Sequence, residues 1–113
     1  MRPSRAHVSQ TLSQPLLSLE EVQKKHQEGV LFIDVRTLQE VAGGKLQGAL
    51  HIPHDQIAQR IDELPEPSKE IVLYCGTGPR ADFALQVLEA NQFTNVHNAG
   101  GYPELQAIVP IET

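Results

Sequence analysis

The sequence predicts an α/β fold built around a parallel sheet. Short apolar segments of strand character, at residues 30–35, 71–74 and 96–98, alternate with stretches that have helical periodicity. Parallel strands need a long crossover connection, usually a helix, whereas antiparallel strands can be joined by a tight turn. The regular alternation of strand and helix is therefore typical of a parallel α/β sheet.

The length of 113 residues is close to the commonest size of a single domain. Residues 1–15 mix Ser, Gln, Arg and Pro without periodicity, which is the composition of a mobile terminus. We therefore expect a flexible N-terminal tail over residues 1–15 and one domain over residues 16–113.

The first helix has clear start and stop signals. Ser18 and Glu21 have the spacing of a capping box, so a helix is expected from there to about Glu28, ended by Gly29. The apolar run at 30–35 follows and suits a strand buried on both faces.

The middle of the chain alternates in the same way. Thr37 and Glu40 repeat the capping-box spacing and predict a short helix that ends at 43–44. Residues 49–52 form a candidate short strand. Asp55 is expected to cap a regular helix whose apolar positions follow a helical pattern and which Pro65 and Pro67 end. Those apolar positions are Ile57, Ile61 and Leu64.

The last third predicts a strand at 71–74, a helix over 80–91 and a final strand at 96–98. In that helix, one face carries Ala and Leu at helical spacing. Because the loop that joins the first two of these elements is only five residues long, the helix begins close to the end of the strand.

Composition excludes several classes of protein. The formal net charge of −5, with no run of Lys and Arg, argues against nucleic acid as a partner. The longest apolar segments are far shorter than the roughly 20 residues that span a bilayer, so no membrane association is expected. The N-terminal residues lack the apolar core of a secretory signal, which predicts a cytoplasmic protein.

Cys75 is the only cysteine, which excludes an intramolecular disulfide, a Cys-x-x-Cys redox pair and a zinc knuckle. A pairing of His51 with His54 as metal ligands is disfavoured, because Pro53 breaks the register between them. We therefore expect no metal and no cofactor. Cys75 directly follows the strand at 71–74, and the carboxyl ends of parallel strands are where open α/β sheets bind ligands.

The loop after Cys75 has the features of an anion site. Gly76 and Gly78, with Thr77 between them, allow successive backbone N–H groups to turn inward. The N-terminus of the next helix contributes partial positive charge, and Arg80 adds a full charge. These features favour a thiolate over a thiol, so Cys75 is the candidate nucleophile.

Four ordered motifs resemble the rhodanese domain over about residues 17–106. They are LFIDVRT at 31–37, GALHIP at 48–53, VLYCGTGPR at 72–80 and NVHNAGG at 95–101. The resemblance implies a rhodanese-like fold, a parallel sheet flanked by helices on both faces, and a sulfurtransferase that works through a cysteine persulfide.

By this resemblance Cys75 carries the transferable sulfur, and the N–H groups of the loop hold it. The substrate-binding residues would then be Gly76, Thr77, Gly78 and Arg80. The implied partners are a small-molecule sulfur donor, thiosulfate-like or a persulfide, and a thiol or cyanide acceptor, with a protein acceptor as a further option. The physiological donor stays open.

Asp34 and Arg36 match the Asp-Val-Arg element of the family. We interpret them as an internal charged pair that braces the first strand against the rest of the fold. They are therefore expected to give structural support to the site without taking part in the chemistry.

Two alternative functions remain open. A cysteine phosphatase or arsenate reductase is disfavoured, because the phosphatase loop has one residue more between Cys and Arg than the four at 76–79. Arsenate reduction through an internal disulfide also needs a second cysteine. The other alternative is a sulfur-relay or binding module that acts only with a partner protein.

Overall fold

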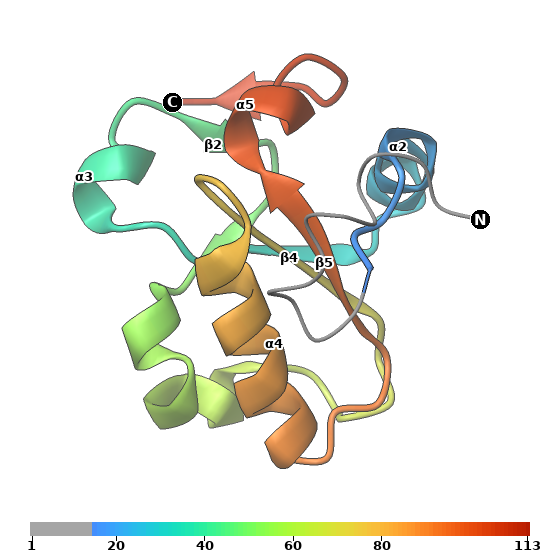
Figure 1. Ribbon diagram of the computed structural model, residues 1–113, viewed down its shortest axis with the longest axis vertical. Helices are drawn as coiled ribbons and strands as arrows, with labels where there is room; N and C mark the ends of the chain where they lie inside the picture. Colours follow the sequence, from blue (N-terminus) through green and yellow to red (C-terminus); the bar gives the residue numbers. More distant parts are fainter. Residues whose placement is uncertain (1–14) are drawn as a thin grey trace.

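The computed structural model describes residues 15–113, and its centre is a parallel sheet (Figure 1). The four strands lie in the order β3-β1-β4-β5, and every neighbouring pair is parallel. Their bounds are β1 Leu31–Asp34, β3 Leu50–His51, β4 Ile71–Cys75 and β5 Val96–Gly101. The predicted α/β fold with a parallel sheet is confirmed.

Helices connect the strands and cover the sheet. The α-helices are α2 Leu19–Gln27, α3 Leu38–Val41, α4 Pro79–Ala90 and α5 Tyr102–Leu105, and the 3₁₀ helices are η2 His54–Gln56 and η3 Ala58–Glu63. A second, small antiparallel sheet pairs β2 Lys45–Leu46 with β6 Ile111–Glu112. Neither this small sheet nor α5 is predicted by the patterns of the sequence.

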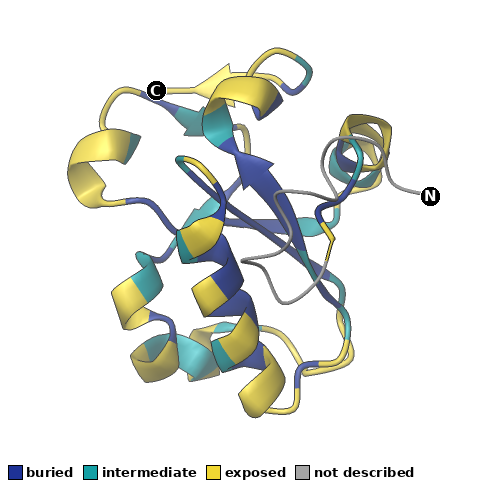
Figure 2. Cartoon of the chain, in the orientation of Figure 1, coloured by how far each residue is buried: buried dark blue, intermediate teal, exposed yellow. Residues whose placement is uncertain are grey.

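The strands of the central sheet consist mostly of buried residues, which are drawn in dark blue in Figure 2. One face packs against α4 and η3 in a cluster that includes Ile33, Leu73 and Leu85. The other face packs against α2 and α5 in a cluster that includes Val22 and Leu105. Because successive side chains of a strand point to opposite faces, one strand serves both clusters.

Both predicted capping boxes are present. Ser18 accepts a hydrogen bond from the N–H of Glu21, whose carboxylate accepts one from the N–H of Ser18. Thr37 and Glu40 exchange the same two bonds at the start of α3. These bonds satisfy backbone N–H groups that a helix start leaves unpaired.

The predicted regular helix capped by Asp55 is wrong. The chain forms two 3₁₀ helices there, η2 begins after Pro53 without a side-chain cap, and Asp55 lies inside η2. Within η3 the backbone of Arg60 is non-helical, with φ −117° and ψ 23°. Ile57, between the two helices, is fully buried and keeps a helical backbone, with φ −55° and ψ −48°, so the interruption lies at Arg60.

The last strand is longer than the predicted 96–98, because β5 continues through Gly101. Its register with β4 shifts between Leu73 and Cys75, which places Gly101 opposite Cys75. The predicted flexible tail over residues 1–15 lies, apart from Pro15, outside the described residues. Between residues 15 and 113, no helix is long and apolar enough to cross a membrane.

Candidate active site

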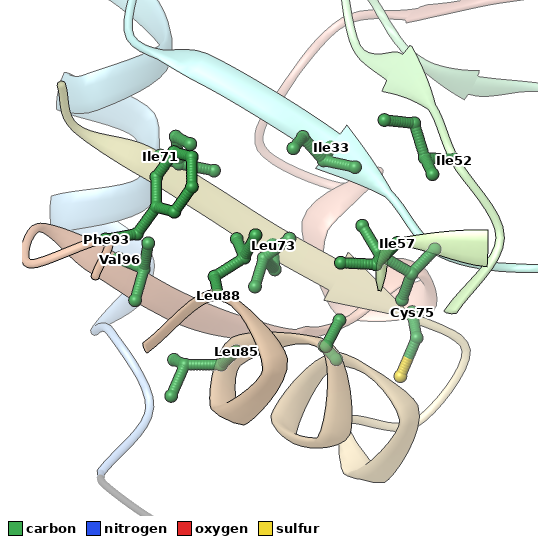
Figure 3. Packing of buried hydrophobic residues seen from close by; sticks show 13 residues of the cluster. Ile33, Ile52, Ile57, Ile71, Leu73, Cys75, Leu85, Leu88, Phe93 and Val96 are labelled. Carbon is green, nitrogen blue, oxygen red and sulfur yellow. The ribbon is translucent and has the colours of Figure 1, made fainter. Parts of the chain in front are cut away.

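Cys75 lies at the carboxyl end of β4, in the middle of the sheet. It shares a face with Leu73 and belongs to the apolar cluster under α4. Figure 3 shows Cys75 at one end of that cluster, with its Sγ pointing away from Ile33 and Leu73. The residue has no exposed surface. A reagent can therefore reach Sγ only when a neighbouring group moves.

The loop from Cys75 to α4 holds the sulfur through one backbone group. The N–H of Gly78 donates a hydrogen bond to Sγ over 2.8 Å. Gly78 has φ +118°, in the region that disfavours residues with a Cβ. Thr77 is exposed. Pro79 occupies the first position of α4, where a missing N–H costs little.

Gly76 serves the loop differently from Gly78. Its φ is not positive, so the expectation of an unusual conformation applies to Gly78 alone. A Cβ on Gly76 would lie 3.0 Å from Nη2 of Arg80 and 3.3 Å from Oε2 of Glu40. Glycine at position 76 therefore makes room for two charged side chains.

Arg80 lies beside the loop, and its charge is paired. Its Nη1 and Nη2 donate to the two carboxylate oxygens of Glu40 over 2.8 and 3.0 Å. The sequence pattern around Glu40 indicates only a capping box and does not predict this contact. The hydrogen bonds from Arg80, followed by the one from the N–H of Thr37, lower the pKa of Glu40 to about 2.

The Glu40–Arg80 pair should make stability depend on pH. A carboxyl with a lowered pKa stabilises the fold above its ordinary value, here 4.5, and this contribution is lost as the pH falls towards 2. Because the Glu40 side chain is 37% exposed, we expect about 1 kcal/mol or less. Urea unfolding should show Glu40→Gln less stable than wild type at pH 6 and equal to it near pH 2.

The matched control is Glu28→Gln, which removes the same charge at the exposed end of α2. A Glu40→Gln difference that stays constant from pH 6 to pH 2 would contradict the assignment of the low pKa to this pair.

Asn98 and Gly101 of β5 contact the cysteine loop and help to position it. The buried Asn98 side chain donates from Nδ2 to the carbonyl of Gly78 and accepts at Oδ1 from the N–H of Gly100. A Cβ on Gly101 would lie 2.7 Å from the carbonyl oxygen of Gly76. Both residues stand in a motif noted in the sequence, but their part in positioning the loop was not predicted.

Asp34 and Arg36 form a buried ion pair at the end of β1. The Arg36 guanidinium donates from Nε and Nη2 to the Asp34 carboxylate, with the shortest distance 2.8 Å. Nη2 also donates to the carbonyl of Gly44, and Cζ lies 3.9 Å from the centre of the Tyr102 ring. These contacts join β1, the segment before β2, and α5.

A pocket of about 470 Å³ opens beside the first turn of α4. Its lining residues are His54, Asp55, Ala58, Pro79, Arg80, Phe83 and Val87. The rings of His54 and Phe83 meet edge to face at 6.0 Å. Pro79 and Arg80 belong to both the pocket wall and the end of the cysteine loop, so the pocket adjoins the candidate site.

His51 and His54, which the sequence disfavours as a metal-binding pair, have other contacts. His51 Nε2 forms a hydrogen bond with the carbonyl of Arg36 over 2.8 Å. Within residues 15–113, no group of three or more His, Cys, Asp or Glu side chains could hold a metal ion.

Comparison with known proteins identifies the family. A family model described as the rhodanese-like domain matches residues 18–108. The thiosulfate sulfurtransferase PspE of Escherichia coli (strain K12) is 31% identical over 75 residues, which cover 66% of this chain and 72% of PspE. A sulfurtransferase of Allochromatium vinosum is 33% identical over 93 residues, which cover 82% of this chain and 78% of that protein.

Solved structures support the same family assignment. A structure of rhodanese with anions from E. coli is 28% identical, has a TM-score of 0.68, and covers 74% of this chain and 96% of its own. The parallel sheet, the cysteine loop at its carboxyl edge and the match over residues 18–108 lead to one conclusion. This chain belongs to the rhodanese-like domain family.

Proposed function

We propose that the protein is a sulfurtransferase that carries sulfur as a persulfide on Cys75. The observation that carries the proposal is the position of Sγ. It lies at the carboxyl edge of a parallel sheet, where it accepts a hydrogen bond from the N–H of Gly78. A backbone N–H aimed at sulfur stabilises an anion there, both as thiolate and as persulfide.

The reaction has two balanced steps. The Cys75 thiolate attacks the outer sulfur of a donor such as thiosulfate, the sulfur–sulfur bond of the donor breaks, and sulfite leaves with the bonding electrons. Cys75 then bears a persulfide anion. In the second step an acceptor such as cyanide attacks the outer sulfur, thiocyanate leaves, and the thiolate is restored.

The residues of the loop take different roles in this proposal. Gly78 holds the sulfur, Gly76 leaves space, and Thr77 faces the solvent from which a donor arrives. Arg80, which is paired with Glu40, can act only by charge, because a guanidinium stays protonated and cannot serve as a base. Asp34 and Arg36 support the sheet end through their buried pair and touch no reacting atom.

Intact-mass measurement tests the proposal. Incubation with thiosulfate or an organic sulfane donor should add one sulfur atom to the wild type, and cyanide should remove it. The Cys75→Ala variant should remain unmodified, and a cooperative unfolding transition should show that it is folded. A wild-type chain that no sulfane donor modifies would rule out the transferase function.

A relay with a partner protein is the second candidate, and the burial of Cys75 favours it. A protein acceptor that docks over the loop could move the groups that cover Sγ. Slow turnover with thiosulfate and cyanide, together with fast transfer from the loaded chain to one acceptor protein, would select the relay. Fast turnover with the small molecules alone would select the independent enzyme.

A further inference from the structure

We propose that the site selects a donor with a single negative charge and an apolar organic body over thiosulfate. This inference rests on the proposed sulfurtransferase function and names its substrate class. Two independent observations support it: the ion pair that neutralises the only cation of the loop, and the apolar pocket beside that loop.

The first observation concerns charge. Arg80 is the only Lys or Arg among residues 75–80, and both of its terminal nitrogens are bound by Glu40. A Cβ on Gly76 would lie 3.3 Å from Oε2 of Glu40, so this carboxylate reaches the loop itself. Asp55 adds a second carboxyl group on the adjoining pocket wall.

A dianion is therefore poorly matched to this loop. To engage Arg80, thiosulfate would have to displace Glu40 or bind beside its carboxylate, and like charges at close range repel. A donor with one negative charge meets half of that repulsion. It can place its terminal sulfur near the N–H of Gly78 without a counter-ion for a second charge.

The second observation concerns the pocket. Its wall includes Ala58, Pro79, Phe83 and Val87, which are all apolar. Phe83 is 52% exposed, so it offers a large apolar surface to a ligand. An apolar group that fills the pocket would remove this surface from water, which is favourable. Small-molecule sites commonly combine such a wall with a few polar groups.

The shared first turn of α4 connects the two observations. Pro79 and Arg80 line the pocket, and Gly78, directly before them, holds Sγ. A donor with its organic body against Phe83 would therefore present its terminal sulfur to the loop. Thiosulfate has no such body and gains nothing from the pocket.

Two donor classes share this chemistry, and both give balanced reactions. An organic persulfide R–S–S⁻ transfers its outer sulfur to the Cys75 thiolate and leaves as the thiolate R–S⁻. A thiosulfonate R–SO₂–S⁻ transfers its outer sulfur and leaves as the sulfinate R–SO₂⁻. In each case the bonding electrons go with the leaving group, and Cys75 gains one sulfur.

Three sulfur donors separate the effect of the donor's charge on the loading rate from the effect of its organic group. Thiosulfate is a dianion without a body, methanethiosulfonate a monoanion with a small body, and benzenethiosulfonate a monoanion with a large apolar body. The second-order rate of sulfur loading is measured for each by intact mass and divided by its rate with free cysteine. After this correction, we expect benzenethiosulfonate to exceed thiosulfate by at least about ten-fold, a difference of roughly 1.4 kcal/mol.

Two variants, Glu40→Gln and Phe83→Ala, test whether the donor selectivity comes from the ion pair and from the pocket. Glu40→Gln keeps a residue that fits the capping box, and it frees the Arg80 charge. It should raise the ratio of thiosulfate to methanethiosulfonate loading several-fold. The matched control Glu63→Gln breaks the equivalent pair with Arg60 on η3 and should leave the ratio unchanged.

Phe83→Ala removes the aromatic wall and should lower the ratio of benzenethiosulfonate to methanethiosulfonate several-fold. Its control is Ile111→Ala, which removes a comparably exposed apolar side chain from β6. Because each readout is a ratio of two donors with one variant, partial loss of folded protein cancels.

The outcomes distinguish the two proposals. If no donor loads the wild type, the sulfurtransferase function fails. If the donors load Cys75 but the corrected rates for thiosulfate and benzenethiosulfonate are equal, the function stands and the selectivity is overturned. The selectivity is also overturned if each variant gives the same donor ratio as its control. These ratios are thiosulfate to methanethiosulfonate for Glu40→Gln, and benzenethiosulfonate to methanethiosulfonate for Phe83→Ala. The wild-type ranking keeps the test decisive even if a variant does not fold.

Discussion

Replacing Arg36 with Leu is expected to lower the free energy of unfolding by about 3–5 kcal/mol, because it leaves a carboxylate buried without its partner. Asp34 has no exposed surface and Arg36 only 5%. The substitution removes the bonds from Arg36 to Asp34 and to the carbonyl of Gly44, and the contact with the Tyr102 ring. Urea titration followed by circular dichroism measures the loss.

The control for this prediction is Arg60→Leu. Arg60 forms a two-bond pair with Glu63 that is solvent-exposed, so its loss should destabilise the fold much less than the loss of Arg36 does. The double variant Asp34→Leu with Arg36→Leu should be more stable than Arg36→Leu alone, since no buried charge is left unpaired. Equal costs for the Arg36 and Arg60 substitutions would refute the buried-pair argument.

Gly101→Ala is expected to slow sulfur loading of Cys75 at least about ten-fold while the protein stays folded. The φ of Gly101 is −102°, which any residue can adopt, so space is the constraint. The added Cβ would lie 2.7 Å from the carbonyl oxygen of Gly76 and 3.4 Å from Cα of Thr77. Both are backbone atoms, which cannot rotate away, so the loop has to shift.

A shifted loop matters because Gly101 lies opposite Cys75 in the register of β4 and β5. Stabilisation of charge on sulfur depends on N–H donors close to the sulfur, so moving the loop weakens it. Loading by a sulfane donor is followed by intact mass, and folding by thermal denaturation. The matched control is Gly43→Ala, where the added Cβ meets nothing closer than 3.9 Å. Equal loading rates in both variants would show that close packing of this segment is dispensable.

Local patterns of the sequence determined the order and type of most elements. The capping boxes at Ser18 and Thr37 mark the starts of α2 and α3, because a cap involves residues only three positions apart. The apolar run before Cys75 is strand β4, and Pro79 opens α4. Since these signals act within a few residues, they also placed Cys75 at the carboxyl edge of the sheet.

Local patterns failed where packing decides. The segment around Ile57 has helical spacing but folds as two 3₁₀ helices, and the backbone of Arg60 inside the second one is non-helical. The β2–β6 pair joins residues far apart in the chain. Strands of two residues are too short to show a periodic pattern, so they cannot be predicted from the sequence.

The details of the candidate site depend on contacts between distant residues, and only the tertiary structure decided them. Glu40 and Arg80 are 40 positions apart, and nothing local distinguishes this capping glutamate from Glu21. Asn98 reaches Gly78, and Gly101 approaches Gly76, only because β5 pairs with β4. The residue types of the candidate site are therefore readable from the sequence, whereas their charge balance and spacing arise from strand pairing and packing, which act through space.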